Sequence, residues 1–445
     1  MKLHYLLGTF FLKILLLTFL AIFLSFSLIA QNIAQKKASN KAIKSKKITQ
    51  IKTKKNSKNI TKKTIAKLKP LINSALNYIQ HPQYLKSFYT ALRELSNDKD
   101  KSKTKKKSNQ RKKVTILHIG DSHIQAGFLT DKMRELLQNK YGNGGRGLIF
   151  PYKVINSTQP DNFVINSTGL WQGYSSVRTN IFSRWGISGF TAITQDEKAT
   201  ITLQPSHKKP ENITKIKIFY PLFDKTSFDL KLLATHKEIK SSKIDENGYV
   251  EYLFHVPQKL VSLYFKQQHI EQKQFILQGL TWENDNRGIV YHTAGVNGAD
   301  VESFLRCADF QKQITALNPD LVIISLGAND ILVPNFKPDL FKVNYKILLQ
   351  QIKNAMPSAA ILVTSPNISC NFDKKPNPNL DVLVTTLSEL AKNERLAFWD
   401  FYTISGKKEN IATWTQENLL TNDKIHLFKK GYELQAQELF KVLVK

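Results

Sequence analysis

Four apolar runs limit this chain of 445 residues to a small set of folds. The runs are Val114–Ile119, Ile289–Thr293, Leu321–Ser325 and Ala360–Thr364; Ile, Leu, Val and Ala make up most of three of them, and Ile289–Thr293 begins with Ile-Val-Tyr. Near-continuous apolar strands are buried on both faces, as in parallel sheets that carry helices on either side. Helical patterns precede the last two runs, so we predict an α/β fold in which helices cover a parallel sheet.

A different pattern separates the first run from the other three. Residues 153–287 hold short alternating segments divided by turn residues, without helical periodicity. These segments are Ala199–Leu203, Ile216–Tyr220, Phe228–Leu233, Tyr249–Phe254, Val261–Phe265 and Phe275–Leu280. We therefore predict an all-β sandwich domain at 153–287, inserted between the two parts of the α/β domain, 114–152 and 288–445. Between the first strand and the insert we expect a helix and a glycine-rich loop, Gly142–Gly147.

The N-terminal residues 1–30 have the pattern of an export signal or a membrane anchor. Lys2 and Lys13 precede the uncharged apolar stretch Ile14–Ala30. The dense lysines that follow favour retention in the cytoplasm by the positive-inside rule, which conflicts with export. The chemistry of the C-terminal part, described below, leads us to prefer export.

Residues 70–97 carry apolar side chains at helical spacing, and this pattern predicts a pair of short helices. Pro82 is expected to start the second helix, because proline is favoured in the first turn of a helix. The pair lies between two linkers, 31–69 and 98–113.

The basic charge of the chain is concentrated in those two linkers. Of a formal net charge of +30, residues 31–69 carry +14 and residues 98–113 carry +7. The remainder is nearly neutral, which argues against nucleic acid as a partner of the folded part. The Lys-rich tracts are interpreted as solvated tethers or as electrostatic contacts with anionic membrane or wall polymer.

The cysteine content excludes two classes of protein. Cys307 and Cys370 are the two cysteines, too few for a disulfide framework in a chain of this length. Neither stands in the Cys/His spacing of a zinc site, and no metal or other cofactor is expected.

The block Gly120-Asp121-Ser122-His123 follows the first predicted strand directly. A serine at a strand-to-helix turn exposes its hydroxyl, and its amide lies at a helix N-terminus, where developing negative charge is favoured. This is a suitable position for a nucleophile. An Asp/Ser helix cap would give the same tripeptide, so the motif alone decides nothing.

A second block, Asp423-Lys424-Ile425-His426, lies near the C-terminus and precedes a predicted helix at Tyr432–Leu443. Two intervening residues allow the carboxylate to fold back and accept a hydrogen bond from the imidazole Nδ1–H. Nε2 is then free to act as a base.

Two further blocks follow predicted strands. Gly327-Ala328-Asn329-Asp330 comes after Leu321–Leu326, and an asparagine amide at the carboxyl edge of a parallel sheet can donate to an oxyanion. Gly298, after the strand Ile289–Thr293, allows a backbone N–H to approach a ligand closely.

Together and in this order the four blocks resemble the SGNH (GDSL-type) hydrolase superfamily, whose fold is a three-layer α/β domain with a parallel sheet. The resemblance implies a serine esterase with Ser122 as nucleophile and His426 and Asp423 completing a Ser-His-Asp triad. It also implies an oxyanion hole formed by the Ser122 amide, Gly298 and Asn329.

The extended sequence Gly-Asp-Ser-His-Ile-Gln-Ala, the Gly-Gly-Arg-Gly run at 144–147 and the β insert resemble Gram-negative peptidoglycan O-acetylesterases, in which the insert is similar to a carbohydrate-binding module. This resemblance implies hydrolysis of O-acetyl esters on a cell-wall glycan, with peptidoglycan as the partner and a periplasmic location. The open alternatives are a carbohydrate O-acetyltransferase with the same triad and, from another class, a non-catalytic wall-binding protein.

Several other residues have two interpretations each. His123 is a candidate for substrate contact or for packing at the helix N-terminus, and Arg146 for a substrate carboxylate or for a structural loop. His118 lies on the first strand and is expected to be a hydrogen-bonded core residue. Three tryptophans of the insert are interpreted as sandwich core in preference to a sugar-stacking surface: Trp171, Trp185 and Trp282.

Overall fold

The computed structural model describes residues 71–96 and 111–445, apart from residues 161–162, 182, 206–211, 223, 236–238 and 334. Residues 71–445 form one compact unit. The predicted signal or anchor at 14–30 and the Lys-rich tract at 31–69 lie outside the described residues, as does most of the tract at 98–113. Within the part that is described, no helix has both the length and the apolar character needed to cross a membrane.

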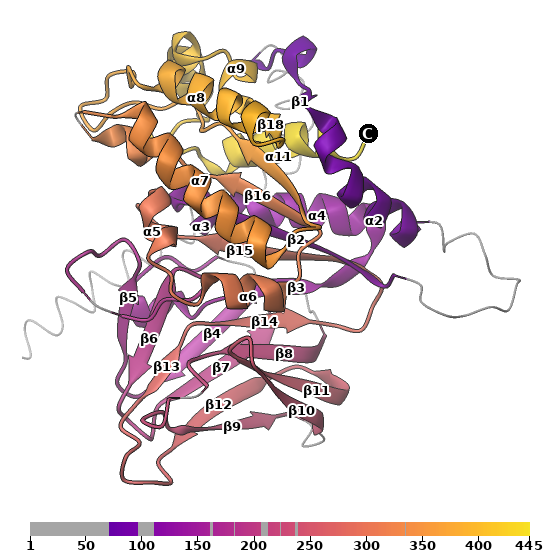
Figure 1. The fold of residues 1–445 in the computed structure, drawn as a ribbon, viewed down its shortest axis with the longest axis vertical. Helices are drawn as coiled ribbons and strands as arrows, with labels where there is room; N and C mark the ends of the chain where they lie inside the picture. Colours follow the sequence, from indigo (N-terminus) through magenta and orange to yellow (C-terminus); the bar gives the residue numbers. More distant parts are fainter. Residues whose placement is uncertain are drawn as a thin grey trace, which may run out of the picture. The chain divides into compact units, whose positions relative to one another are not determined.

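A mixed sheet of eleven strands runs through this unit (Figure 1). Its strands, in spatial order, are β1 (Ile79–Gln80), β18 (Ala397–Trp399), β17 (Ala360–Thr364), β16 (Leu321–Ser325), β2 (Lys113–Gly120), β15 (Gly288–Gly295), β3 (Asn143–Ile149), β14 (Gly279–Glu283), β8 (Ile213–Phe219), β11 (Tyr249–Gln258) and β10 (Ile239–Asp245). The six strands from β18 to β3 are parallel. The four apolar runs of the sequence are therefore parallel strands, as predicted.

The register of this sheet aligns the carboxyl ends of its central strands. Gly120 at the end of β2 pairs with Gly295 on β15 and with Ser325 on β16. The residues that follow these three strands consequently leave the sheet at one edge, where open α/β sheets place their ligand sites.

Helices cover both faces of the parallel part, which gives the three-layer arrangement expected from the sequence. The longer helices are α2 (Lys86–Ser96), α4 (Phe128–Tyr141), α6 (Phe310–Leu317), α7 (Pro338–Ala355), α8 (Leu380–Asn393) and α11 (Lys429–Leu443). The short helices are α3 (Ser122–Gln125), α5 (Val301–Leu305), α9 (Phe401–Ile404) and α10 (Ile411–Gln416), and the 3₁₀ turns are Ser74–Leu76, Pro82–Leu85, Tyr152–Ile155, Asp330–Leu332 and Lys408–Asn410. Helix α4 packs on α11 and β15, whereas α7 packs on α5, α6 and α8 and crosses the face turned toward the viewer in Figure 1.

Apart from the 3₁₀ turn Tyr152–Ile155, the regular elements described in the segment 153–287 are β-strands, consistent with an inserted sandwich. It adds a four-stranded sheet of β4 (Phe163–Thr168), β7 (Thr200–Pro205), β12 (Val261–Lys266) and β9 (Asp229–Ala234), and a three-stranded sheet of β13 (Phe275–Leu277), β6 (Phe190–Thr194) and β5 (Gln172–Ser175). Its remaining strands extend the central sheet, because β14 pairs antiparallel with β3. The predicted boundary at 152/153 therefore does not separate two sheets, because the central sheet continues from β3 of the α/β part into β14 of the insert.

The predicted glycine-rich loop at Gly142–Gly147 is wrong, because most of it forms strand β3. Glycine is required there by close backbone packing. A Cβ atom at Gly147 would lie 2.7 Å from the Tyr291 carbonyl oxygen, and Gly145 and Gly147 have φ values of +125° and +91°. These glycines permit close strand pairing and not a loop.

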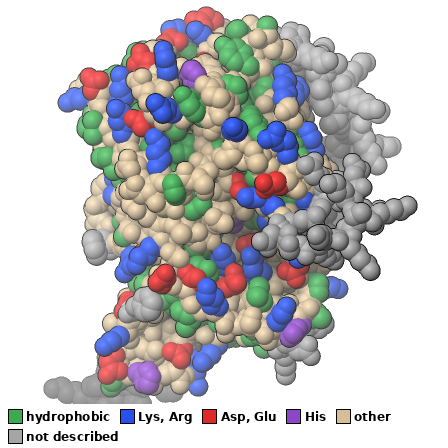
Figure 2. All heavy atoms as spheres, turned by 45° about the vertical axis from the view of Figure 1, so that its right-hand side comes forward, with side chains coloured by type: hydrophobic (Ala, Val, Ile, Leu, Met, Phe, Trp, Pro, Cys, Tyr) green, Lys and Arg blue, Asp and Glu red, His purple; other side chains and the backbone are tan. Residues whose placement is uncertain are grey.

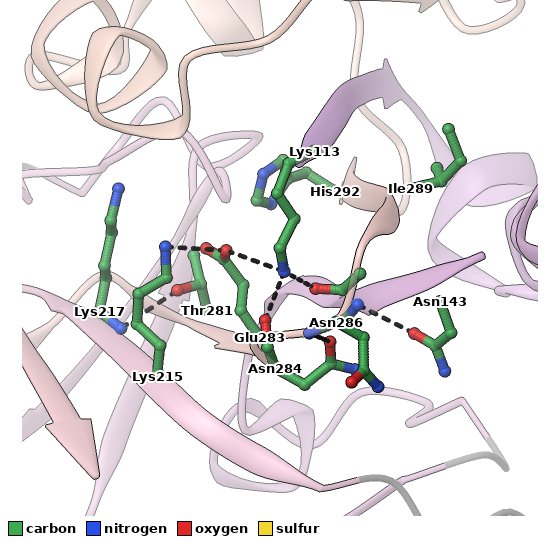
Figure 3. Close-up of polar contacts among 12 residues, drawn as sticks. Lys113, Asn143, Lys215, Lys217, Thr281, Glu283, Asn284, Asn286, Ile289 and His292 are labelled. Carbon is green, nitrogen blue, oxygen red and sulfur yellow. Dashed lines mark hydrogen bonds and ion pairs between the residues drawn. The ribbon is translucent and has the colours of Figure 1, made fainter. Parts of the chain in front are cut away.

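A buried charge cluster joins the two parts of the central sheet (Figure 3). Glu283 on β14 lies 2.9 Å from the Lys215 Nζ on β8 and 4.0 Å from the Lys113 Nζ on β2. Lys113 also donates to the carbonyl oxygens of Gly144 and Asn284. Burial by itself would raise the pKa of Glu283, but the charge and hydrogen bond of Lys215 together with the nearby His292 and Lys113 lower the pKa below its usual value. Glu283 therefore stays ionised and links the insert to the first strand of the α/β part.

Away from this cluster, charged side chains of both signs are interspersed over the face drawn in Figure 2. This agrees with the near-neutral charge that the sequence assigns to the folded part.

The predicted helical pair at 70–97 is correct only in its second half. Pro82 starts a 3₁₀ turn that leads into α2, but the preceding residues form a 3₁₀ turn and strand β1. Strand β1 pairs antiparallel with β18, and Asn77 accepts a hydrogen bond from Trp399 Nε1. Helical spacing was misleading because edge pairing with β18 decides the local structure.

We expect this segment to be part of the core of the α/β unit. Phe88 on α2 is fully buried, so Phe88→Ala should lower the free energy of unfolding by about 3–5 kcal/mol. Arg93→Ala, at an exposed position of the same helix, should change it by less than about 0.5 kcal/mol. The free energy of unfolding of both variants is measured by denaturant unfolding. If both substitutions lowered it equally little, α2 would not be part of the core.

Candidate active site

Ser122, His426 and Asp423 form a continuous chain of hydrogen bonds at the carboxyl edge of the sheet. The Ser122 Oγ lies 2.8 Å from the His426 Nε2, and the His426 Nδ1 lies 2.7 Å from an Asp423 carboxylate oxygen. The serine and the histidine are separated by 304 residues in the sequence. The arrangement can transfer a proton from the hydroxyl to the imidazole, which is what a serine nucleophile requires.

Helix α3 positions Ser122. Asp121 caps this helix by accepting a hydrogen bond from the His123 amide at 2.9 Å, and its carbonyl oxygen accepts from the Ile124 and Gln125 amides. Gly120 must be glycine, because a Cβ atom there would lie 2.9 Å from the Ser325 carbonyl oxygen. The cap interpretation and the nucleophile interpretation of Gly-Asp-Ser are therefore compatible: Asp121 caps, and Ser122 faces the histidine.

The loop before α11 holds the carboxylate in place. One oxygen of Asp423 accepts hydrogen bonds from the amides of Ile425 and His426, at 2.8 and 3.0 Å, and from the hydroxyl of Thr421. Lys424, between them, adopts a left-handed conformation with φ of +55°. Partial burial alone would raise the pKa of Asp423, but these hydrogen bonds and the imidazole hold it well below its usual range. The carboxylate therefore remains ionised beside His426.

Three candidate oxyanion donors lie on neighbouring loops. Gly298 is the third residue of a tight turn closed by the Ala299 amide and the Val296 carbonyl oxygen, and its φ of +80° favours glycine. Asn329 donates from Nδ2 to the Ala299 carbonyl oxygen at 2.9 Å, which joins its loop to this turn. Within the part of the chain that the structure describes, the amides of Ser122 and Gly298 donate to no protein acceptor.

Gln125 is a residue of this site that the sequence analysis did not single out. It is buried, and its Oε1 accepts from the Asn297 amide at 2.6 Å, next to Gly298. Its Nε2 donates to the Ser157 Oγ at 2.5 Å, at the start of the insert. The sequence feature that could have identified Gln125 is its position in Gly-Asp-Ser-His-Ile-Gln-Ala, three residues after the serine on the same short helix.

His123 is buried, and its ring lies next to the ring of His426. Its Nδ1 is 2.8 Å from the Tyr432 hydroxyl and 3.2 Å from the Asn367 Nδ2, and its ring centroid lies 5.0 Å from that of His426. Burial lowers the pKa of His123 to about 3, so the ring is neutral. These contacts favour the packing role over the substrate-contact role.

Arg146 is also buried, on strand β3, with 4% of its side chain exposed. Its guanidinium lies 3.4 Å from an Asp131 oxygen and over the Phe163 ring at 4.5 Å. This environment favours the structural alternative over recognition of a substrate carboxylate.

His118 and two of the three tryptophans are core residues. His118 is fully buried between the Tyr291 and Ser325 hydroxyls, at 2.8 Å from each, as expected. Trp185 and Trp282 are buried, whereas Trp171 is partly exposed, packs edge-on against Phe265 and donates to the Thr168 carbonyl oxygen. Among the described residues, no group of His, Cys, Asp or Glu has an arrangement that could hold a metal ion.

Two buried carboxyl groups lie under the site. Burial raises the pKa of both Asp121 and Asp330 to about 7. Asp330 accepts from the Val301 amide at 3.2 Å and so ties the Asn329 loop to the segment after Gly298.

Asp121 should make the folded state less stable as the pH rises. Its folded pKa of about 7 lies above the unfolded value, so the folded protein binds an extra proton from about pH 4 to 7, and stability falls through this window. Asp121→Asn keeps the cap acceptor and removes the ionisation. The stability of the variant relative to the parent should therefore rise between about pH 4 and 7 in thermal unfolding, and a difference that does not change over this range would contradict a raised pKa of Asp121.

Sequence comparison matches part of the chain to a known family. Residues 273–434 match the GDSL-like lipase/acylhydrolase family, a span that includes Gly298, Asn329 and the Asp423–His426 loop and begins after Ser122. This part of the chain is therefore similar to GDSL-like lipases and acylhydrolases.

Structural comparison adds a more particular likeness. The structure described as "Peptidoglycan O-acetylesterase in action" matches with a TM-score of 0.65 and 21% identity, over 80% of this chain and 95% of that chain. The two proteins therefore share the fold, insert included. No curated protein matches the chain.

Two other solved structures align with a smaller part of the chain. An Enterococcus faecalis lipase/acylhydrolase covers 35% of this chain and 75% of its own, with 22% identity and a TM-score of 0.28. The Geobacillus stearothermophilus acetylxylan esterase Axe2 covers 35% of this chain and 73% of its own, with 18% identity and a TM-score of 0.30.

Proposed function

We propose that this chain is a serine esterase that removes O-acetyl groups from a cell-wall glycan, with peptidoglycan as its substrate. The observation that carries the proposal is the hydrogen-bonded chain from Ser122 through His426 to Asp423. The shared fold with a peptidoglycan O-acetylesterase supports the choice of substrate.

In the first half of the reaction Ser122 Oγ attacks the acetyl carbonyl carbon while His426 Nε2 accepts the hydroxyl proton. Asp423 stabilises the imidazolium that forms and fixes Nδ1–H toward itself. The tetrahedral intermediate collapses as His426 returns the proton to the sugar oxygen, which leaves as an alcohol. An acetyl-enzyme remains on Ser122.

In the second half, water attacks the acetyl-enzyme and His426 again accepts a proton. Acetate leaves and Ser122 regains its hydroxyl hydrogen. In both halves the carbonyl oxygen carries developing negative charge, which the amides of Ser122 and Gly298 and the Asn329 side chain stabilise. A sugar hydroxyl in place of water would give acetyl transfer.

The same proposal includes export. A cell-wall substrate lies outside the cytoplasm, and the N-terminal stretch Ile14–Ala30 has the apolar character of an export signal. The Lys-rich tracts would then contact anionic wall or membrane.

Replacing Ser122 by alanine should reduce acetate release from O-acetylated peptidoglycan to background. Thermal unfolding should be unchanged within about 0.5 kcal/mol, because a small residue at a turn contributes little packing. The assay compares O-acetylated with chemically de-acetylated peptidoglycan. Parent-like activity of Ser122→Ala would remove Ser122 from the mechanism, and absence of release by the parent protein would remove the substrate.

Gln125→Met should lower kcat for an aryl acetate because the Asn297–Gly298 turn loses its hydrogen bond. We expect a loss of about tenfold, smaller than the 10²–10³ for loss of a whole oxyanion donor, with KM little changed. Ser157→Ala is the matched control, since it removes the other partner of Gln125 and leaves the Asn297 contact. Equal losses in both variants would assign Gln125 to anchoring of the insert.

A further inference from the structure

Two loops meet beside His426. The loop at residues 421–428 carries Asp423 and His426, and the loop at residues 370–376 follows the carboxyl end of β17. The Cys370 amide donates to the Lys424 carbonyl oxygen at 2.8 Å, which joins the loops directly. The second loop closes on itself through a hydrogen bond from the Asn371 amide to the Lys375 carbonyl oxygen. Both loops are therefore fixed relative to the imidazole.

Each loop presents a phenylalanine to solvent. Phe372 is 76% exposed and Phe428 is 42% exposed, although burial of an aromatic ring is strongly favourable. Exposed aromatic rings at a site rim provide flat apolar surface for a ligand. Single exposed apolar residues are common on proteins, but here two lie on joined loops beside the catalytic histidine.

Lysines follow both phenylalanines in the sequence. Lys374 and Lys375 follow Phe372, and Lys429 and Lys430 follow Phe428 in the first turn of α11. Cations in the first turn oppose the helix dipole, so their position is unfavourable for the helix itself. Lys375 lies 3.3 Å from Asp373 and Lys429 lies 3.9 Å from Glu433. No described acidic group forms an ion pair with Lys374 or Lys430.

We propose that Phe372, Phe428, Lys374 and Lys430 form a basic aromatic rim that binds carboxylate-bearing glycan and presents its acetyl ester to Ser122. The rings pack against sugar faces and the ammonium groups attract carboxylates of the lactyl ether or peptide stem. The rim, and not Arg146, would bind a substrate carboxylate, because Arg146 is buried against Asp131. This inference rests on the proposed function and adds to it the requirement for an acidic substrate.

The charge of the rim is tested with Lys374→Gln/Lys430→Gln in the full chain. The ratio of kcat/KM for soluble O-acetylated muropeptides to kcat/KM for a neutral aryl acetate should fall about tenfold. The difference in this ratio between the parent and the variant should become smaller as the salt concentration is raised from about 50 to 200 mM, because salt screens exposed charges. Lys312→Gln/Lys392→Gln, which changes two exposed lysines on α6 and α8, is the matched control and should leave the ratio unchanged.

The carboxylates are tested on the substrate side. O-acetylated muropeptides whose carboxyl groups have been converted to methylamides should be hydrolysed equally well by the parent and the rim variant. The proposal would be overturned if the rim variant lost kcat/KM equally on native and amidated muropeptides. It would also be overturned if the control variant showed the same loss of kcat/KM as the rim variant.

The aromatic contribution is tested with Phe372→Ala and Phe372→Tyr. The alanine variant should raise KM for native muropeptides about fivefold, and the tyrosine variant should preserve it. Binding of muropeptides by Ser122→Ala, with and without the rim substitutions, provides a readout that needs no turnover. Intact binding that the rim substitutions do not weaken would overturn the rim alone, whereas absence of acetate release by the parent protein would overturn the proposed function.

Discussion

The in-register pairing of β2 with β15 and β16 is the constraint on which the site depends. Because Gly120, Gly295 and Ser325 lie side by side, the segments carrying Ser122, Gly298 and Asn329 leave the sheet at one level. Short hydrogen bonds then join these segments, from Asn329 to the Ala299 carbonyl oxygen and from the Asn297 amide to Gln125. These hydrogen bonds hold the three segments with candidate donors at one edge of the sheet, and a fixed arrangement of donors is what the proposed oxyanion hole would require.

The insert is bound to this frame by the sheet itself and by buried charge. Strand β14 pairs with β3, and Glu283 on β14 holds Lys215 of the insert and Lys113 of the first α/β strand. Removing one partner of such a cluster leaves an uncompensated buried charge, so the joint resists separation. Ser157, at the start of the insert, accepts a hydrogen bond from Gln125, so one side chain connects the insert to the turn that contains Gly298. The insert and the α/β part belong to one compact unit, residues 71–445.

Charge in this protein has two distributions with different physical consequences. The Lys-rich tracts carry most of the net charge in the sequence, whereas the described surface mixes both signs, as Figure 2 shows for one face. The proposed rim has two lysines, and one of them, Lys430, lies in the first turn of α11, where the positive end of the helix dipole adds to its field. A local concentration of positive potential at a site is more effective in orienting a ligand than the same charge spread over a solvated tract.

The sequence by itself determined the parallel strands, the β insert and the order of the chemistry-bearing blocks, because apolar runs and turn residues report local burial and chain reversal directly. It did not determine β1 or β3, since pairing with β18 and close packing against Tyr291 override helical spacing and a glycine-rich composition. The contact between Ser122 and His426, the role of Gln125 and the burial of His123 and Arg146 were decided only by tertiary structure. Each depends on which segments, separated by up to 304 residues, the sheet brings to the same edge.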